Sequence, residues 1–220
     1  MNYRLAFYSS VLRALKNSLR FRGSSNYWDE RYAKGGNSGE GSYGELANFK
    51  AEFINRFIQE QHILSVIEFG CGDGNQLRLA TYPKYTGVDV SIEAINLCRK
   101  IFAGDNQKVF CIASEHRGQT AELGLSLDVI YHLVEDEVFG IYMRNLFASA
   151  SRFVIIYSSN SDSMASYSPH VRHREFSTWV EKNIRGWMLE KVVPNRYPTG
   201  LRSSETSFAH FHIFARQAEM

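Results

Sequence analysis

Three glycines at alternate positions, directly after a short apolar run, give the sequence its clearest chemical signature. They are Gly70, Gly72 and Gly74, and Glu68 stands just before them. Glycine adopts positive φ readily and lacks the Cβ that would keep a ligand away from the main chain. A strand that leads into such a turn and then into a short helix is how α/β proteins hold a nucleotide-like cofactor. The spacing differs from the G-x-G-x-x-G of pyrophosphate-binding loops, and a dinucleotide-binding fold or a turn without a ligand is the alternative.

A second carboxylate is predicted at the end of the next strand. Residues 85–90 have the composition of a strand, and Asp89 falls near its carboxyl end. A carboxylate in this position can accept two hydrogen bonds from ribose hydroxyls. The glycine turn and Asp89 together predict a site for a cofactor that contains a nucleoside.

The acidic residue and the three glycines, followed by the sequence GVDVS at residues 87–91, resemble class I S-adenosylmethionine-dependent methyltransferases. The resemblance extends from about residue 27 to the C-terminus. It implies an α/β fold with three layers: a doubly wound, Rossmann-like sheet of seven strands, mostly parallel, with the last strand antiparallel beside the fifth. It also implies S-adenosyl-L-methionine as the cofactor. The glycine-rich segment 35–44 and the segment 170–174 further resemble bacterial methyltransferases that modify surface glycans or small molecules.

The resemblance implies a set of cofactor-binding residues at the carboxyl ends of the strands and in the N-terminal segment. They are Trp28, Tyr32, Glu68, Gly70, Cys71, Gly72, Gly74, Asp89, Val90, Ser114, Asp128 and Val129. Trp28, Arg31 and Tyr32 belong to a segment that closes over the cofactor in many class I enzymes, and an aromatic face attracts a sulfonium cation. The alternative is that Tyr27 and Trp28 only anchor this segment in an apolar groove.

Methyl transfer to a hydroxyl is helped by a base, because an alcohol must lose its proton during the attack. Histidine suits this role near neutral pH. The candidates are His132, at the end of the fourth strand, and His170 and His173, in a loop that related folds turn over the acceptor. Alternatively, His132 is a hydrogen-bonded histidine of the cavity wall and the other two form a structural turn. With no third ligand apparent, we expect no metal site.

Arg172 and Arg174 lie in the same loop and could hold a phosphate or carboxylate through paired hydrogen bonds. Tyr131 is expected to contact the acceptor as well. The alternative for the arginines is salt bridges to Glu175 and Glu181. With the basic N-terminus, the arginines favour an anionic or lipid-linked acceptor.

The sequence therefore predicts a methyltransferase for a hydroxyl of a small molecule or sugar. An N-methyltransferase, a non-catalytic regulatory or scaffold protein that binds a nucleotide cofactor, and an NAD-dependent oxidoreductase are the alternatives. The D/N-P-P-aromatic motif of enzymes that methylate nucleic-acid amines is absent, and a net charge of +2 does not indicate a nucleic-acid partner.

The elements that must position these residues follow from hydrophobic periodicity. We expect strands at residues 63–69, 85–90, 109–112, 127–133, 153–157, 187–193 and 207–215. Helices are expected between most of them, and Ser91 is expected to cap one. The helix that precedes the fifth strand should have an apolar face of Val138, Ile141, Tyr142 and Leu146.

Length and composition agree with a single domain. A chain of 220 residues with 44% hydrophobic and 22% charged residues is typical of one soluble α/β domain. Three cysteines without a C-x-x-C pair suit the reducing cytoplasm. No apolar run approaches the ~18 residues that cross a bilayer.

We divide the chain into residues 1–45, a basic helix and a glycine-rich lid, and residues 46–220, the cofactor-binding domain. Residues 1–22 contain arginines and a lysine but no acidic residue. Such an amphipathic helix can lie on an anionic membrane, here the inner face, or pack on the domain with its charges in water. Five glycines among residues 35–44 suggest a mobile cover over the site.

Overall fold

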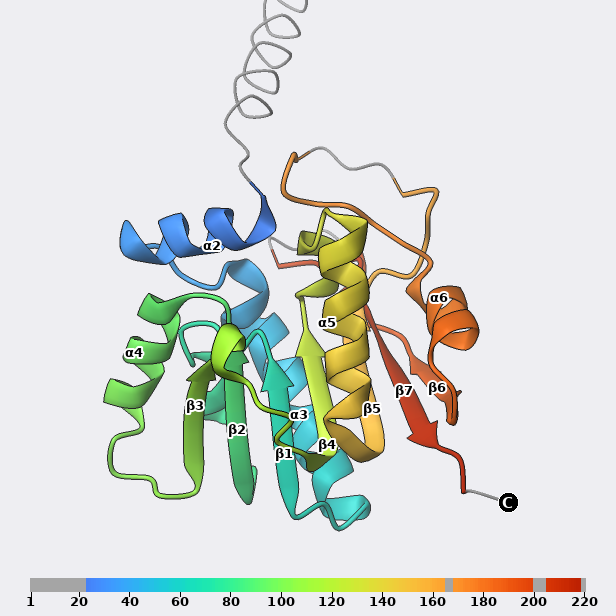
Figure 1. Ribbon diagram of the computed structural model, residues 1–220, viewed down its shortest axis with the longest axis horizontal. Coiled ribbons are helices and arrows are strands. Elements are labelled where there is room, and N and C mark those ends of the chain that lie inside the picture. The colour runs from blue at the N-terminus through green and yellow to red at the C-terminus, as the bar shows by residue number, and fades with distance from the viewer. Residues whose placement is uncertain (1–22, 165–167, 200–204, 219–220) are drawn as a thin grey trace, which may run out of the picture.

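The computed structural model describes residues 23–164, 168–199 and 205–218, so the predictions for residues 1–22 lie outside the described part. Seven strands form one sheet in the order β3-β2-β1-β4-β5-β7-β6 (Figure 1). They are β1 (Ser65–Phe69), β2 (Lys84–Asp89), β3 (Lys108–Ile112), β4 (Ala121–Leu127), β5 (Ala150–Ser158), β6 (Trp187–Val193) and β7 (His210–Arg216). Strands β1 to β5 pair in parallel, and β7 runs antiparallel between β5 and β6. The predicted strand number and the antiparallel last strand beside the fifth are confirmed.

Helices cover both faces of the sheet, as the doubly wound prediction requires. The helices on the faces are α3 (Gly44–Glu60), α4 (Ile92–Ile101), α5 (Asp136–Ala148) and α6 (Phe176–Asn183), while α2 (Ser24–Ala33) lies beyond the carboxyl ends of the strands (Figure 1). One core cluster joins Ile54 of α3 and Ile95 of α4 to the sheet, and the other joins Met143 of α5 and Phe176 of α6 to its opposite face. In the described residues no helix is both long and apolar enough to span a membrane.

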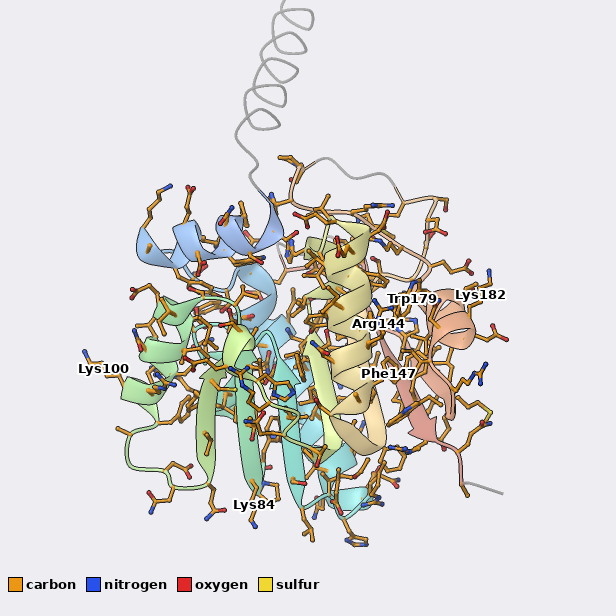
Figure 2. The ribbon with its side chains drawn as sticks, in the orientation of Figure 1. Lys84, Lys100, Arg144, Phe147, Trp179 and Lys182 are labelled. Carbon is orange, nitrogen blue, oxygen red and sulfur yellow. The ribbon has the colours of Figure 1, made fainter. Side chains whose placement is uncertain are left out.

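Helices α5 and α6 contact each other through Trp179, whose ring packs edge-on against Phe139 at 5.3 Å. The Arg144 guanidinium lies 6.0 Å from the centre of the Trp179 ring, and Phe147 packs in the core beneath (Figure 2). Lys84, Lys100 and Lys182 lie at the periphery of the molecule in the same view. The sequence thus separates apolar and charged side chains as a globular domain requires.

The predicted fourth strand at residues 127–133 is wrong. Strand β4 lies earlier and ends at Leu127, because Asp128 has a left-handed backbone (φ 60°) that turns the chain out of the sheet. A single turn of 3₁₀-helix, Ile130–His132, follows. The residues after Asp128 look like a strand in the sequence because several of them are apolar. In the structure these apolar residues form the turn and part of the cavity wall. Asp128 and His132 nevertheless lie at the carboxyl end of the sheet, as expected.

The connection between β3 and β4 contains no helix. It holds only a 3₁₀ turn at Ala113–Glu115. Helix α5 covers the front face of β4 and β5 in Figure 1. Among the described residues, no α-helix covers the same face of β2 and β3. Val109 of β3 is accordingly 58% exposed. The expected alternation of strands and helices is interrupted here, and this part of the sheet is packed mainly from the side of α4.

Candidate functional site

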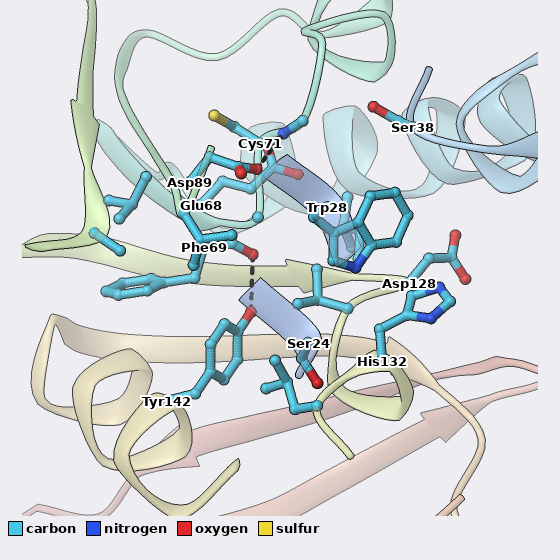
Figure 3. A pocket seen from close by; sticks show the side chains of 18 of the residues that line it. Ser24, Trp28, Ser38, Glu68, Phe69, Cys71, Asp89, Asp128, His132 and Tyr142 are labelled. Carbon is cyan, nitrogen blue, oxygen red and sulfur yellow. Dashed lines mark hydrogen bonds between the residues drawn. The ribbon is translucent and has the colours of Figure 1, made fainter. Parts of the chain in front are cut away.

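A cavity of about 320 Å³ lies at the carboxyl ends of β1, β2 and β4 (Figure 3). The chain order reverses between β1 and β4, since β2 and β3 follow on one side and β5 on the other. Parallel α/β sheets bind their ligands in the crevice at such a point. The N-terminal segment closes the cavity, since Ser24, Trp28, Tyr32, Ser38 and Ser42 contribute to its wall.

The three glycines form a turn at the cavity, and Gly70 and Gly72 line it. Gly70, Gly72 and Gly74 have φ values of 84°, 57° and 76°, in the left-handed region that favours glycine. A Cβ on Gly70 would collide with the Val129 side chain, and a Cβ on Gly72 would collide with Ser38. The glycines therefore allow neighbouring segments to approach the loop. Gly74 itself does not line the cavity.

Two buried carboxylates, Glu68 and Asp89, line the cavity beside the glycine turn. Glu68 accepts a hydrogen bond of 2.6 Å from the Tyr85 hydroxyl, and burial raises the pKa of Glu68 to about 7. Asp89 accepts hydrogen bonds from the main-chain N–H groups of Gly72 (2.8 Å) and Ser91 (3.0 Å). Burial also raises the pKa of Asp89, and the main-chain N–H groups of Ser91, Gly72 and Val90 oppose that shift. Both carboxylates keep lone pairs for a ligand.

The glycine-rich cover segment, residues 35–44, is fastened to the glycine turn through Asp73. The Asp73 carboxylate accepts hydrogen bonds from Ser38 N (2.9 Å) and from the Tyr43 hydroxyl (2.8 Å). In return, Asp73 N donates to Ser38 Oγ at 3.0 Å. Tyr32 OH lies 2.9 Å from the same oxygen. The sequence placed this segment over the site but did not identify Asp73 as the residue that holds it.

An ion pair between Lys50 and Asp128 forms part of the cavity wall. Lys50 of α3 donates to Asp128 Oδ2 at 2.6 Å, and the Tyr131 hydroxyl donates to Asp128 Oδ1 at 3.0 Å. Lys50 was not predicted as a site residue. The signal was available, because Lys50 stands one helical turn from Leu46 and from Ile54 on the buried face of α3.

Among the three candidate histidines, His132 lines the cavity. Its Nδ1 lies 3.0 Å from the carbonyl oxygen of His170. A carbonyl only accepts, so Nδ1 carries the hydrogen and Nε2 keeps a lone pair. Burial lowers the pKa of His132 to about 4, so the ring is neutral near pH 7. The Trp28 ring meets it edge-on at 5.0 Å, and Figure 3 shows both rings on the side of Asp128.

The other two histidines, His170 and His173, lie outside the cavity lining. His170 stacks on Tyr27 with ring centres 4.3 Å apart, and its carbonyl orients His132. His173 is buried, with Nδ1 2.7 Å from Ser159 Oγ. Burial lowers the pKa of both histidines. Neither side chain lines the cavity.

The two arginines, predicted to hold an anion of the acceptor, pair with Asp136, which is also not one of the acids named in the alternative, Glu175 and Glu181. Arg172 and Arg174 lie 3.0 and 3.1 Å from Asp136 Oδ1. Arg174 also donates to the main-chain carbonyls of residues 133 and 134, and its side chain is 11% exposed. These contacts tie segment 170–174 to the start of α5. Tyr131, the third predicted acceptor contact, also lies outside the cavity lining.

The structure brings most of the predicted cofactor residues to the cavity. Those that line it are Trp28, Tyr32, Glu68, Gly70, Cys71, Gly72, Asp89, Val90, Asp128 and Val129. Ser114 does not, and Ala113 stands at the cavity in its place. Val138 and Ile141 of the predicted apolar face of α5 are exposed and line the cavity, while Phe139 and Met143 supply the core. In the described residues no group of three or more His, Cys, Asp or Glu side chains could hold a metal ion.

No family model and no curated protein sequence matches the chain. Solved structures do match. The N-methyltransferase NodS from Bradyrhizobium japonicum WM9, in complex with S-adenosyl-L-homocysteine, aligns with a TM-score of 0.67 at 13% identity, over 90% of this chain and 100% of NodS. Magnesium protoporphyrin IX methyltransferase (ChlM) from Synechocystis PCC 6803 aligns at 0.61 and 15%, over 88% and 97%. The mitomycin 7-O-methyltransferase MmcR aligns at 0.58 and 15%, over 79% and 55%.

At these identities the likeness shows the fold. The chain has the Rossmann-like fold of class I S-adenosylmethionine-dependent methyltransferases, as its glycine motif predicted.

The residues present fit the cofactor of that fold. The glycine turn leaves its main chain open, and Asp89 faces the cavity with unused lone pairs. Gln76 also lines the cavity, and its Oε1 is buried without a hydrogen-bond partner in the described part of the chain. An apolar wall that includes Val90 and Val129 completes a site for a nucleoside joined to an amino acid.

Proposed function

We propose that the protein is an S-adenosylmethionine-dependent methyltransferase that transfers a methyl group to a hydroxyl of a small molecule or sugar. One observation supports this most. The glycine turn, Asp89 and the neutral imidazole of His132 share one cavity at the carboxyl ends of β1, β2 and β4. The first two suit the cofactor, and the third suits the proton of an acceptor.

The chain's own residues would hold the cofactor along the strand ends. Asp89 would accept hydrogen bonds from the ribose hydroxyls, and Glu68 would face the amino-acid end. Val90, Ala113 and Val129 would pack on the adenine ring. When bound, the cofactor supplies a methyl group on a sulfonium and leaves as a neutral thioether.

His132 would remove the proton of the acceptor hydroxyl through Nε2. The His170 carbonyl fixes the tautomer that leaves this lone pair available. The ring of Trp28, edge-on to His132, adds a surface that attracts cations. His170 would therefore position the base, and His173 would hold the loop through Ser159.

The likeness to solved structures does not select the acceptor atom, since NodS is an N-methyltransferase and MmcR is an O-methyltransferase. An anionic acceptor would have to compete with Asp136 for Arg172 and Arg174. The neutral imidazole of His132, a base for an alcohol proton, is the feature that favours a hydroxyl.

Two measurements test this function. Calorimetry with S-adenosylmethionine and S-adenosylhomocysteine should show binding, and binding of NAD instead would indicate an oxidoreductase. A screen with radiolabelled methyl donor against small-molecule, lipid and glycan fractions of a cell extract should label a product, whose methylated atom is read by NMR. Cofactor binding without transfer to any fraction would support the non-catalytic alternative, and a methylated nitrogen would support the N-methyltransferase.

Replacing Asp89 by alanine should weaken the binding of S-adenosylhomocysteine by about 1.5–3 kcal/mol, the range for hydrogen bonds to a charged group. The variant loses the acceptor for the ribose and also the partner of Gly72 N. Calorimetry measures the change. Asp105→Ala, in the exposed turn before β3, is the matched control and should bind normally. Unchanged affinity in Asp89→Ala would remove Asp89 from the cofactor site.

A further inference from the structure

Lys50 is the one lysine or arginine among the described residues that line the cavity. Its side chain is 1% exposed, and its Nζ lies 2.6 Å from Asp128 Oδ2 and 5.4 Å from the centre of the Tyr157 ring. Lysine is almost never fully buried unless its charge is paired, and an apolar residue would fill this helix position without desolvating a charge. The charge at this position therefore calls for a functional reason.

The ion pair is held in a fixed place. Asp128 has a left-handed backbone, a conformation that is uncommon for residues other than glycine. Its main-chain N donates to the Tyr157 carbonyl at 2.9 Å, and its Oδ1 accepts from Tyr131. Burial raises the pKa of Glu68 and the charge of Lys50 opposes that rise, so the ammonium acts on the ends of both β4 and β1. Lys50 thus stands where these two strands meet the cavity.

The charges of the cavity and of the proposed cofactor are complementary. Glu68, Asp89 and Asp128 contribute carboxylates, and Lys50 contributes the ammonium. S-adenosylmethionine carries a sulfonium, an ammonium and one carboxylate. A carboxylate taken out of water loses several kcal/mol of hydration unless it meets a cation or hydrogen-bond donors. The Lys50 ammonium has three N–H donors, and the hydrogen bond to Asp128 uses one.

We propose that Lys50 binds the carboxylate of the cofactor's methionine part, and that Asp128 holds the ammonium in position for it. Gln76 lies on the same wall, since its side-chain amide donates to the carbonyl of Ala47 on α3, and its unpartnered Oε1 suits the neighbouring amino group. The inference rests on the proposed cofactor and not on the proposed acceptor.

The test compares two ligands that differ only in this carboxylate. They are S-adenosylhomocysteine and its decarboxylated analogue, S-adenosyl-3-thiopropylamine, and their binding to the full chain is measured by calorimetry. The unmodified protein should bind S-adenosylhomocysteine about 10–100-fold more tightly, the factor that corresponds to one hydrogen bond between charged groups. In Lys50→Met this preference should vanish, because S-adenosylhomocysteine loses that factor and the analogue does not. A preference that survives in Lys50→Met overturns the proposal.

Two further variants keep the test decisive. Lys50→Met leaves Asp128 buried without its cation, so Lys50→Met/Asp128→Asn, which removes both charges, should fold and should also lack the preference. Lys34→Met removes an exposed lysine that pairs with Glu30 at 2.7 Å, and it should keep the preference. If the unmodified protein binds neither ligand, the proposed cofactor is wrong. If it binds both equally, only the role of Lys50 is wrong.

Discussion

Replacing His132 by glutamine is expected to lower the turnover of methyl transfer about 10²–10⁴-fold, the range for loss of a general base. Glutamine can still donate to the His170 carbonyl, so the wall of the cavity should keep its shape. The affinity for S-adenosylhomocysteine should therefore change little. Single-turnover kinetics and calorimetry separate the two quantities.

The pH dependence of this base follows from its burial. Burial lowers the pKa of His132 to about 4, from an ordinary value of 6.5. The ring is therefore already neutral at pH 6, and the rate should be flat between about pH 6 and 8 and fall only as protonation begins near pH 4. A base with the ordinary pKa would lose half of its rate at pH 6.5. The acidic limb should be missing from the residual rate of His132→Gln.

A matched control is available at His62, an exposed histidine before β1 at the opposite end of the sheet. His62→Gln should turn over at the normal rate. If His132→Gln also keeps the normal rate, transfer proceeds by positioning of the acceptor alone, and His132 is a wall residue.

Replacing Gly72 by valine is expected to weaken cofactor binding by at least about 100-fold. The left-handed backbone at Gly72 is strained for valine by about 1–3 kcal/mol. Overpacking adds about 1–3 kcal/mol, because the new Cβ would collide with Ser38 Oγ and would lie 2.9 Å from Tyr32 OH. The cover segment would have to leave the glycine turn, and the cavity would lose one wall. Calorimetry measures the affinity, and thermal unfolding shows whether the variant is folded.

Gly35→Val separates strain from collision. Gly35 also has positive φ (75°), but a Cβ there would meet nothing within 4 Å. This variant should carry the backbone strain and still bind the cofactor. If Gly72→Val and Gly35→Val bind the cofactor with equal affinity, the contact of Ser38 with the loop is unimportant for binding.

The sequence predicted the parallel core well because the strands of the sheet and the glycine turn are local patterns. The apolar run from Ile63 to Phe69 that predicted β1 needs no knowledge of distant residues. The end of β4 was misplaced because the left-handed backbone of Asp128 depends on Lys50, Tyr131 and Tyr157, which lie far away or follow in the chain.

The same reason explains the missed parts of the site. Arg172 and Arg174 find Asp136 only after the chain folds, while a reading along the chain offered nearer acids. Val138 and Ile141 were correctly placed on an apolar face, but periodicity does not show what covers that face. Here the cavity lies beside that face. Lys50 was the exception, since a lysine at a buried helix position was visible in the pattern itself.

The connection between β3 and β4 contains no α-helix. We therefore expect β2 and β3 to open locally more easily than the rest of the sheet. Strands β2 and β3 lack a helix on one face, and Val109 is exposed there. Amide hydrogens in such thinly packed strands exchange with solvent through low-energy openings. Asp89 and Ala113, at the ends of these two strands, also line the cavity. A ligand bound there stabilises the closed state, so deuterium uptake in β2 and β3 should slow more than elsewhere in the sheet once the cavity is filled.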